Sequence, residues 1–197
     1  MNAELFESIT ESLVESGYIV IENALDLTLL EELSLYGEDE SFYQKAGISS
    51  KNDLHIDSNK RSDKTRWLEE DGSSMSEYLL FADSLKNYLN QALYLGLCYY
   101  EAHFALYERG DFYEKHKDAF KGSKNRVVTT VLYLNKEWST SDGGELLIYD
   151  NQDSLIEKVT PKMGTLVIFL SENFPHEVVR TKRKRHSIAG WFRVDKR

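Results

Sequence analysis

The sequence predicts an α+β protein that is mainly β, in which helices from the N-terminal half cover one face of a sheet. Amphipathic patterns with helical spacing occur only in the first 96 residues. From residue 97 onward, short runs of β-branched and aromatic residues alternate with turn signals such as "ERGD" and "TSDGGE". Short strands at this spacing are typical of a β-sandwich or barrel, and helices followed by strands are typical of an α+β chain.

Three amphipathic segments form the predicted helices. In the first, Leu5, Ile9 and Leu13 recur at four-residue intervals on one face, and Gly17 ends the segment. A short β-branched strand, "YIVIENAL", follows it. The predicted helices span residues 4–16, 27–39 and 76–96.

The other predicted elements are a loop and a series of strands. The polar stretch from Ala46 to Lys64 is rich in Gly, Asp and Asn, which predicts a loop. The strands predicted in the second half are "YYEAHFALYE", "RVVTTVLYLN", "GELLIYD", "GTLVIFLS", "PHEVVRT" and "RHSIAGWFRV". Only two prolines and no Ser/Gly-rich tract occur in the 197 residues, so we expect one domain without a linker.

Cysteine usage and the N-terminus indicate a reducing compartment. The single cysteine, Cys98, excludes an internal disulfide and a multi-thiolate metal site, and the apolar run "ALYLGLCYY" around it predicts a buried thiol. The first residues, "MNAELFESIT", lack the basic and apolar regions of a signal peptide. No apolar run approaches the ~20 residues of a membrane span. We therefore expect a cytoplasmic protein that does not associate with a membrane.

The charge of the chain argues against broad nucleic-acid binding. The formal net charge is −9 and the isoelectric point is about 5.1. The densest basic run, Arg180–His186, is interpreted first as a charged strand edge that discourages unwanted pairing. An anion pocket or a contact for an acidic partner is the alternative for this run.

His116 and Asp118 form an H-x-D pair that is weak evidence by itself. Residues two apart in a strand project from the same face, so this imidazole and this carboxylate can meet one ion. His176, which opens the predicted strand "PHEVVRT", is the candidate third ligand. Two histidines and one carboxylate on one face of a metal are typical of non-haem Fe(II) oxygenases. Zinc with the same ligand set, serving hydrolysis, is the alternative.

Arg185 and Ser187 favour the oxygenase. They follow His176 closely enough to share its pocket on a neighbouring strand. An arginine binds a carboxylate through two parallel hydrogen bonds, and a serine hydroxyl can donate to the same oxygens. A dicarboxylate such as 2-oxoglutarate could therefore chelate the metal at one end and meet Arg185 at the other. A zinc hydrolase needs no such second anchor.

Seven segments between Gly47 and Arg193 carry a family resemblance when taken in order. They are "RSDKTRW", "YERGDFYEKHKDAF", "RVVTTVLYLNKEW", "GGELLIY", "GTLVIFLS", "PHEV" and "RHSIAGWF". In these segments, which cover most of the chain, the sequence resembles the 2-oxoglutarate/Fe(II)-dependent dioxygenases. The resemblance is to prolyl hydroxylases similar to the hypoxia-inducible-factor prolyl hydroxylases and their bacterial relatives.

The resemblance implies a fold and a set of cofactors. The fold is a double-stranded β-helix, or jelly roll, with N-terminal helices packed on one sheet. Residues 1–197 would form one dioxygenase domain, with helical support and a substrate loop in residues 1–96 and the jelly-roll core in residues 97–197. The implied cofactors are Fe(II), 2-oxoglutarate as cosubstrate and O₂, with ascorbate as a candidate reductant.

The resemblance also assigns roles to individual residues. Those that match the iron triad at the catalytic centre are His116, Asp118 and His176. Those that match the 2-oxoglutarate site are Arg185 and Tyr133, which bind the distal carboxylate, with Tyr107 and Ser187 beside them. Those that match substrate positions are Trp191 near the floor of the metal site, Arg126 at the entrance, and Asp63 and Trp67 in a segment that covers the protein substrate.

Simpler interpretations stand beside these roles. The aromatic residues that can instead be core residues of apolar strands are Tyr107, Tyr133 and Trp191. The charges that can instead be solvated in a loop are those of Arg61 and Asp63. Gly143–Gly144 is interpreted as a hairpin turn. The histidines outside the ligand pattern, interpreted as surface or structural residues, are His55, His103 and His186.

The chain departs from the family pattern in two places. The connection "AFKGSKN" is more similar to the bacterial members than to the eukaryotic hypoxia enzymes. Ala189 stands where some relatives have a hydroxyl, so a water contact near the cosubstrate is expected to be missing. The carboxylate Asp118 argues against a halogenase, because family halogenases have a small residue there.

The resulting hypothesis is hydroxylation of a prolyl residue in a protein, coupled to decarboxylation of 2-oxoglutarate to succinate. A protein of the translation apparatus is the expected partner. The alternatives are hydroxylation of a free amino acid or small molecule, a non-catalytic jelly-roll interaction module, and a nucleic-acid demethylase, which the acidic composition disfavours.

Overall fold

The computed structural model describes residues 3–46, 48–50, 53–55, 60–68, 74–119 and 125–195, with backbone alone for residues 48–50 and 53–55. It contains the three predicted helices, α1 (Ala3–Glu15), α2 (Leu27–Glu38) and α3 (Ser74–Leu93). α1 buries Phe6, Ile9 and Leu13, as its spacing predicted. α2 begins after Asp26, whose side chain accepts a hydrogen bond of 2.8 Å from the backbone N–H of Thr28.

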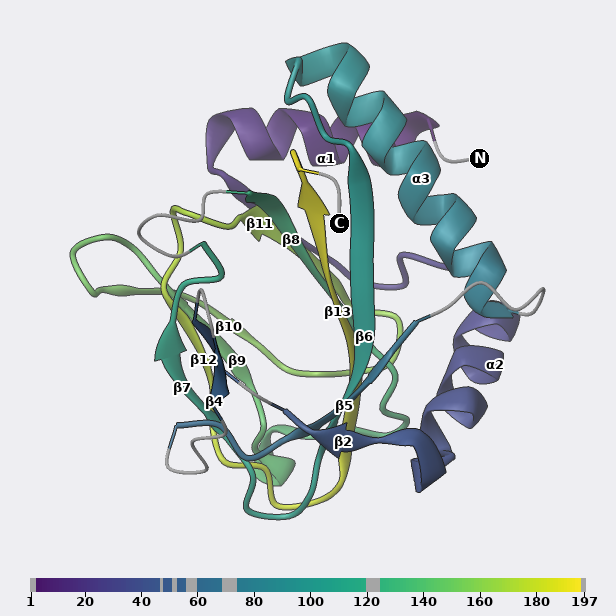
Figure 1. The fold of residues 1–197 in the computed structure, drawn as a ribbon, viewed down its shortest axis with the longest axis vertical. Coiled ribbons are helices and arrows are strands. Elements are labelled where there is room, and N and C mark those ends of the chain that lie inside the picture. The colour runs from purple at the N-terminus through teal and green to yellow at the C-terminus, as the bar shows by residue number, and fades with distance from the viewer. Residues whose placement is uncertain are drawn as a thin grey trace.

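The helices pack together on one face of the larger sheet (Figure 1). The Phe6 ring of α1 lies 5.7 Å from Phe81 and 5.6 Å from Tyr88 of α3, centroid to centroid. Gly17, with φ +81°, ends the first helical segment and allows the chain to turn directly into the sheet. The prediction of an α+β chain with helices on one sheet is therefore confirmed.

Two antiparallel sheets form the body of the protein. The larger has the order β1-β11-β8-β13-β6-β5-β2 and the smaller the order β10-β9-β12-β7. The strands of the larger sheet are β1 (Tyr18–Ile21), β11 (Leu166–Leu170), β8 (Arg126–Tyr133), β13 (Arg185–Arg193), β6 (Tyr99–Tyr107), β5 (Lys64–Trp67) and β2 (Gln44–Lys45). The strands of the smaller sheet are β10 (Leu155–Val159), β9 (Leu146–Tyr149), β12 (His176–Val178) and β7 (Tyr113–His116).

Alternation along each strand divides the core into two layers. In β6, Ala102 and Phe104 pack toward the helices, whereas Ala105 and Tyr107 face the smaller sheet. β13 lies between β6 and β8 in the larger sheet. The inner faces of these three strands therefore form one wall of the space between the sheets.

The predicted loop over residues 46–64 is partly wrong. A short hairpin, β3 (Ile48–Ser50) with β4 (Asp53–His55), lies within it, and β5 begins at Lys64. β5 pairs with β6 at the side of the larger sheet. β10, which is mostly exposed, also escaped prediction. Polar edge strands lack the alternating apolar pattern on which strand prediction depends.

The predicted burial of Cys98 is wrong. α3 ends at Leu93, and in the connection to β6 Leu97 is buried while Cys98 is exposed. The apolar run therefore belongs to two elements and the connection between them, so it does not form a continuous buried segment.

Within the residues that the structure describes, no helix combines the length and the apolar character that crossing a bilayer requires.

Candidate active site

Three side chains converge at one end of the space between the sheets. His116 ends β7, Asp118 follows it by two residues, and His176 begins β12 directly opposite His116 in the strand pairing. One ligand atom from each residue lies within 4.8 Å of the others. Nε2 of His116 is 3.7 Å from Oδ1 of Asp118, and Nε2 of His176 is 3.6 Å from Oδ2. The structure thus brings the predicted triad together.

Backbone hydrogen bonds set the tautomers of both histidines. Nδ1 of His116 lies 2.7 Å from the carbonyl oxygen of Glu114, and Nδ1 of His176 lies 3.0 Å from that of Phe174. A carbonyl can only accept, so each Nδ1 carries the proton and each Nε2 presents a lone pair. This arrangement prepares metal-ligating histidines for the ion.

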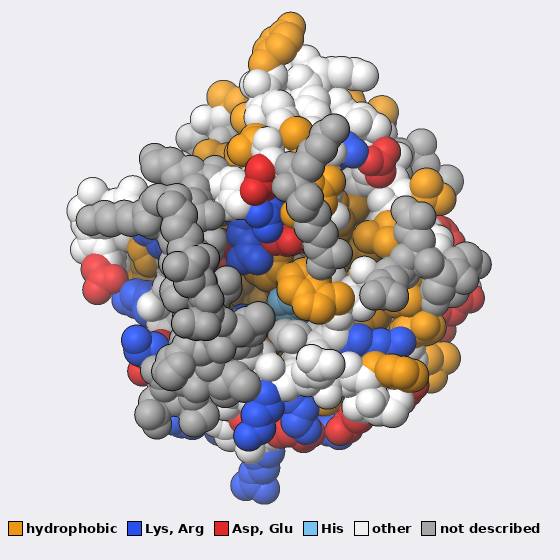
Figure 2. Space-filling view, viewed as in Figure 1, with side chains coloured by type: hydrophobic (Ala, Val, Ile, Leu, Met, Phe, Trp, Pro, Cys, Tyr) orange, Lys and Arg blue, Asp and Glu red, His pale blue; other side chains and the backbone are white. Residues whose placement is uncertain are grey.

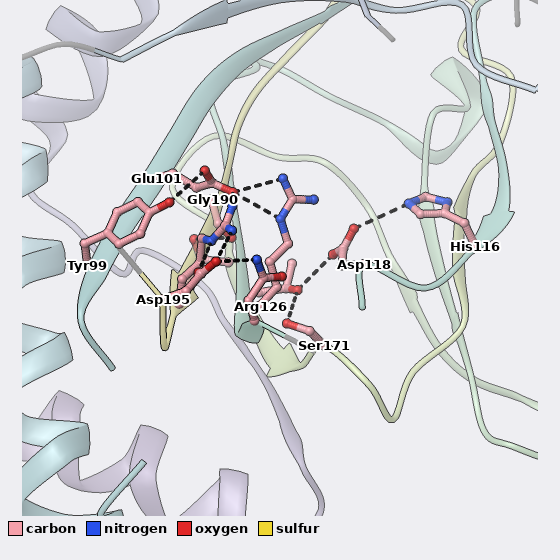
Figure 3. A network of polar contacts seen from close by, with 12 residues as sticks. Tyr99, Glu101, His116, Asp118, Arg126, Ser171, Gly190 and Asp195 are labelled. Atoms are coloured by element: carbon pink, nitrogen blue, oxygen red, sulfur yellow. Dashed lines mark hydrogen bonds and ion pairs between the residues drawn. The ribbon is translucent and has the colours of Figure 1, made fainter. Parts of the chain in front are cut away.

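Asp118 is held by a hydroxyl chain from the opposite sheet (Figure 3). Oγ1 of Thr129, in β8, donates a hydrogen bond of 2.8 Å to Oδ2 of Asp118 and lies 2.9 Å from the Ser171 hydroxyl. Burial lowers the pKa of His116, so this ring stays neutral. Burial alone would raise the pKa of Asp118, but the adjacent His176 and His116 lower it, so the carboxyl is ionised. These are the protonation states that metal binding requires.

A second chain of contacts supports His116 from the mouth of the site. The Tyr113 ring stacks on His116 with centroids 3.6 Å apart, and the guanidinium of Arg61 lies 4.6 Å from the Tyr113 centroid. Arg61 donates two hydrogen bonds, of 2.6 and 2.9 Å, to the carboxylate of Asp63. Asp63 is only 1% exposed, so the interpretation of this pair as solvated loop charges is wrong.

Arg185 lies at the opposite, deep end of the pocket and is 1% exposed. Its Nε donates to the carbonyl of Gly144 at 2.8 Å, and its Nη1 donates to the Ser187 hydroxyl at 3.2 Å. The guanidinium carbon is 4.8 Å from the centroid of Tyr107 and 5.0 Å from that of Tyr133. Among the described residues no carboxylate pairs with Arg185, so a buried positive charge lacks its counter-ion.

The hydroxyl of Tyr133 is a second unmet group beside Arg185. It is buried and has no hydrogen-bond partner among the residues that the structure describes. Burial raises its pKa to about 12 although Arg185 opposes the shift, so the hydroxyl stays protonated and can donate. An anion with a carboxylate end satisfies both this hydroxyl and the guanidinium.

Gly143 and Gly144 form a short backbone segment, and the side chain of Arg185 packs against Gly144. They follow the 3₁₀-helix η2 (Thr140–Asp142) and lead into β9, so the interpretation as a β-hairpin turn is wrong. Gly144 has φ +70°, and a Cβ there would lie 3.0 Å from Cδ of Arg185. Only glycine combines this backbone conformation with such close approach of the arginine.

The pocket between the triad and Arg185 is lined by inner-face residues of both sheets. Those from β6, β8 and β13 are His103, Ala105, Tyr107, Arg126, Thr129, Val131, Arg185, Ser187, Ala189 and Trp191. Figure 2 shows a histidine at the bottom of a hollow that Lys and Arg side chains border on one side and hydrophobic side chains on the other. The metal-ligand cluster and the unpaired arginine therefore open into one shared cavity.

Of the residues predicted to contact substrate, Arg126 and Trp191 line this pocket, whereas Trp67 and Asp63 do not. Arg126 stacks over Trp191 at 3.7 Å and donates two hydrogen bonds to Glu101, of 3.1 and 3.0 Å (Figure 3). Trp67 is 44% exposed and its ring contacts His103 edge-on at 5.2 Å. Asp63, in contrast, is enclosed and reaches the pocket only through Arg61.

Sequence reasoning did not connect several pocket residues with the site. Thr129 shares strand parity with Val131 and Tyr133, and His103 shares it with Tyr107, so alternation could have indicated both. His103 is buried and lines the pocket, whereas His186 is half-buried beside a separate polar cavity. The sequence also suggests that Phe120 helps to shape the mouth of the site, but Phe120 and the side chain of His55 lie outside the described residues.

The fold and the site together define a class of protein, the 2-oxoglutarate/Fe(II) oxygenases. Residues 102–193 match the family model described as the 2OG-Fe(II) oxygenase superfamily. A crystal structure of a Pseudomonas putida prolyl-4-hydroxylase superimposes with a TM-score of 0.88 and 33% identity, covering 96% of this chain and 99% of that one. A Trichoplax adhaerens prolyl hydroxylase, in complex with a hypoxia inducible factor peptide fragment, gives a TM-score of 0.85 and 27% identity over 98% of this chain and 90% of that chain.

Curated sequences agree with the structures. Prolyl hydroxylase EGLN3 of Homo sapiens is 31% identical over 75% of this chain, and the hypoxia-inducible factor prolyl hydroxylase of Caenorhabditis elegans is 26% identical over 94%. The chain spans 62% of the human relative and 28% of the nematode one. The chain belongs to the prolyl hydroxylase family of these oxygenases, which use Fe(II), 2-oxoglutarate and O₂. The expectation of a double-stranded β-helix is confirmed.

Proposed function

We propose that this chain is a peptidyl-prolyl hydroxylase that couples the oxidative decarboxylation of 2-oxoglutarate, to succinate and CO₂, to hydroxylation of a proline in a protein. The observation that carries the proposal is that one pocket contains both a cluster of metal-ligating side chains and a buried, unpaired arginine. A His₂-carboxylate cluster lies at one end, and a buried arginine without a counter-ion lies at the other. An iron ion would bind the cluster, and a carboxylate of a dicarboxylic 2-oxo acid would pair with the arginine.

His116, Asp118 and His176 would hold the iron through Nε2 of each histidine and one carboxylate oxygen. When bound, the iron supplies the oxygen-activating redox chemistry, which no protein side chain provides. The chain itself fixes the ligands in advance. Nδ1–H of each histidine is committed to a backbone carbonyl, and Thr129 orients Asp118. Little reorganisation is then needed when the metal binds.

Arg185 and Tyr133 would bind the distal carboxylate of 2-oxoglutarate. The guanidinium keeps donors that the backbone of Gly144 and the hydroxyl of Ser187 do not occupy, and the Tyr133 hydroxyl is a free donor. The ring of Tyr107 covers the guanidinium and helps to exclude water. The 2-oxo acid end of the cosubstrate is thereby directed toward the metal.

Trp191 and Arg126, which line the pocket, and the exposed Trp67 would contact the protein substrate. Aromatic faces suit a pyrrolidine ring, which is apolar, and Arg126 places a positive charge beside them. Asp63 would act indirectly by holding Arg61 against Tyr113. The Trichoplax relative, whose complex contains a peptide fragment of a protein, supports a peptidyl substrate over a free amino acid.

We place the protein in the cytoplasm and propose a component of the translation apparatus as its first candidate target. The exposed, unpaired thiol of Cys98 suits a reducing compartment. The choice of target rests on the similarity to a bacterial prolyl-4-hydroxylase.

The test is to incubate cell lysate with the protein, Fe(II), 2-oxoglutarate and ascorbate, and to search for prolines that gain the mass of one oxygen atom. We expect such peptides with the wild-type protein, and none with His116→Ala or without 2-oxoglutarate. Succinate release that is stimulated by free proline, without any modified peptide, would indicate the small-molecule hydroxylase instead. Absence of succinate under all conditions would indicate a non-catalytic module.

A further inference from the structure

His103 is a pocket residue that the iron and cosubstrate assignments leave without a role. It lies in the middle of β6, is 3% exposed, and forms part of the pocket wall. Its ring lies between two tryptophans, 5.2 Å from exposed Trp67 and 5.4 Å from buried Trp191. Its cross-strand neighbour in β13 is Ala189. The imidazole therefore lies in the wall of the pocket that also contains the metal cluster.

The ring presents a hydrogen-bond acceptor to this pocket. Nδ1 lies 3.1 Å from the carbonyl oxygen of Phe104, which can only accept, so Nδ1 carries a proton. Burial, reinforced by the positive charge of Arg61, lowers the pKa of His103 to about 3, so the ring is neutral. Nε2 is therefore unprotonated and can accept a hydrogen bond, and no described residue donates one to it.

A purely structural histidine would have both nitrogens satisfied by the protein. Its neighbours Ala105 and Ala189 carry no polar side-chain atom, and none of the donors that line the same pocket has a hydrogen bond to Nε2 in the described structure. Nε2 is an acceptor in the pocket wall that the protein leaves available to a ligand. The missing donor is therefore expected to arrive with a ligand of this pocket.

We propose that His103 is a specificity-determining residue whose Nε2 accepts a hydrogen bond from the backbone N–H of a residue next to the target proline. A prolyl residue has no N–H, so the donor has to come from a neighbour in the same peptide. A peptide that enters the pocket from water must pair its amides again, and this acceptor lies in the pocket wall between Trp67 and Trp191. The inference rests on the proposed peptidyl-prolyl hydroxylase function.

The test uses the proline-containing peptide that the lysate experiment identifies, made synthetically and with each flanking amide N-methylated in turn. With the wild-type protein we expect one N-methylated peptide to lose about tenfold in kcat/KM, the value of one neutral hydrogen bond. His103→Phe should lose about tenfold on the parent peptide and nothing further on that N-methylated peptide, because both partners are then apolar. The KM for 2-oxoglutarate should change less than about twofold, because Arg185 holds that ligand.

Two variants make the result unambiguous. His103→Gln keeps an acceptor and should recover part of the lost peptide affinity, and it serves if His103→Phe fails to fold. His186→Phe removes another imidazole that the pocket does not contain, and should retain wild-type sensitivity to N-methylation. Equal N-methylation penalties in the wild-type and His103→Phe proteins would overturn the inference. A lysate without any modified prolyl peptide would instead refute the proposed function itself.

Discussion

The buried charge of Arg185 destabilises the folded protein until a ligand carboxylate pairs with it. Its guanidinium is enclosed by aromatic rings and glycine, and no described carboxylate compensates its charge. Burying an ion without a partner costs several kcal/mol, so the empty protein retains this residue at the expense of stability. At the scale of single residues, function and stability therefore oppose each other at this position.

Replacing Arg185 by methionine separates its contribution to ligand binding from its effect on stability. We expect Arg185→Met to melt at the same temperature as the wild-type protein or above it without 2-oxoglutarate, because a buried unpaired charge is removed. The affinity for 2-oxoglutarate should fall by at least about 100-fold, since a charge-assisted hydrogen-bond pair is lost. Thermal melting and calorimetric titration with Mn(II) present measure both quantities. Arg183→Met, at an exposed position of the same basic run, is the control, and equal loss of Mn(II) and 2-oxoglutarate binding would contradict the assignment.

Thr129→Val tests whether the hydroxyl that reaches Asp118 tunes the metal site. Valine has the same shape but cannot donate the hydrogen bond of 2.8 Å. Loss of such a supporting contact typically weakens metal binding 10- to 100-fold, which Mn(II) or Co(II) titration would detect. Thr130→Val is the matched control, because the Thr130 hydroxyl instead bonds Tyr100 near the helices. Similar metal affinities in the two variants would rule out the role of Thr129.

At the scale of single residues, the sequence predicts those site residues whose role only a few residue types can perform. The triad, Arg185 and Tyr133 could be predicted because few side chains ligate iron or bind a carboxylate. Thr129 and His103 were missed because threonine and histidine serve many roles, although alternation along β8 and β6 places both on the pocket face. Gly144 was misread because the sequence does not show that an arginine from a distant strand packs against it.

At the scale of elements, apolar strands were predictable and polar ones were not. β8, β11 and β13 contain the buried runs that form the two core layers, so their composition identifies them. β5 and β10 are short and partly exposed, and pairing with a neighbour rather than their own pattern makes them strands. The role of the connection before β9 was likewise not predictable from its own sequence. Its Gly144 carbonyl accepts a hydrogen bond from Arg185 of β13, a distant strand.

Gly144→Ala tests this connection, with Gly96→Ala as a matched control. Both glycines have φ near +70°, at 70° and 68°, so an alanine incurs similar backbone strain, roughly 1–2 kcal/mol. Around Gly96 a Cβ meets nothing within 4 Å, whereas at Gly144 it meets Arg185 and Thr181 at 3.0 and 3.1 Å. We expect both variants to lose stability, but Gly144→Ala alone to lose 2-oxoglutarate affinity. Chemical denaturation and ligand titration distinguish the effects, and unchanged affinity in Gly144→Ala would show that Arg185 adjusts without cost.

At the scale of the whole molecule, the metal cluster joins the two sheets. His116 and His176 belong to β7 and β12 of the smaller sheet, while Asp118 is hydrogen-bonded to Thr129 in β8 of the larger one. Without an ion these contacts consist of a few long imidazole–carboxylate approaches, of 3.6 and 3.7 Å. An ion that draws the three ligands together therefore binds one sheet to the other.

Divalent metal should consequently stabilise the entire fold. A ligand that binds only the folded state adds about 2.7 kcal/mol at a concentration 100 times its Kd, which corresponds to roughly 5–10 °C in Tm for a protein of this size. We expect Mn(II), which does not turn over, to raise Tm by about this amount, EDTA to reverse the rise, and 2-oxoglutarate to add a further increase only when Mn(II) is present. His116→Ala should abolish the metal-dependent rise. Lys115→Ala, at the neighbouring exposed position in β7, should retain it. A rise that survives in His116→Ala would mean that the stabilising metal binds elsewhere, because the cluster would then have lost one of its two imidazoles.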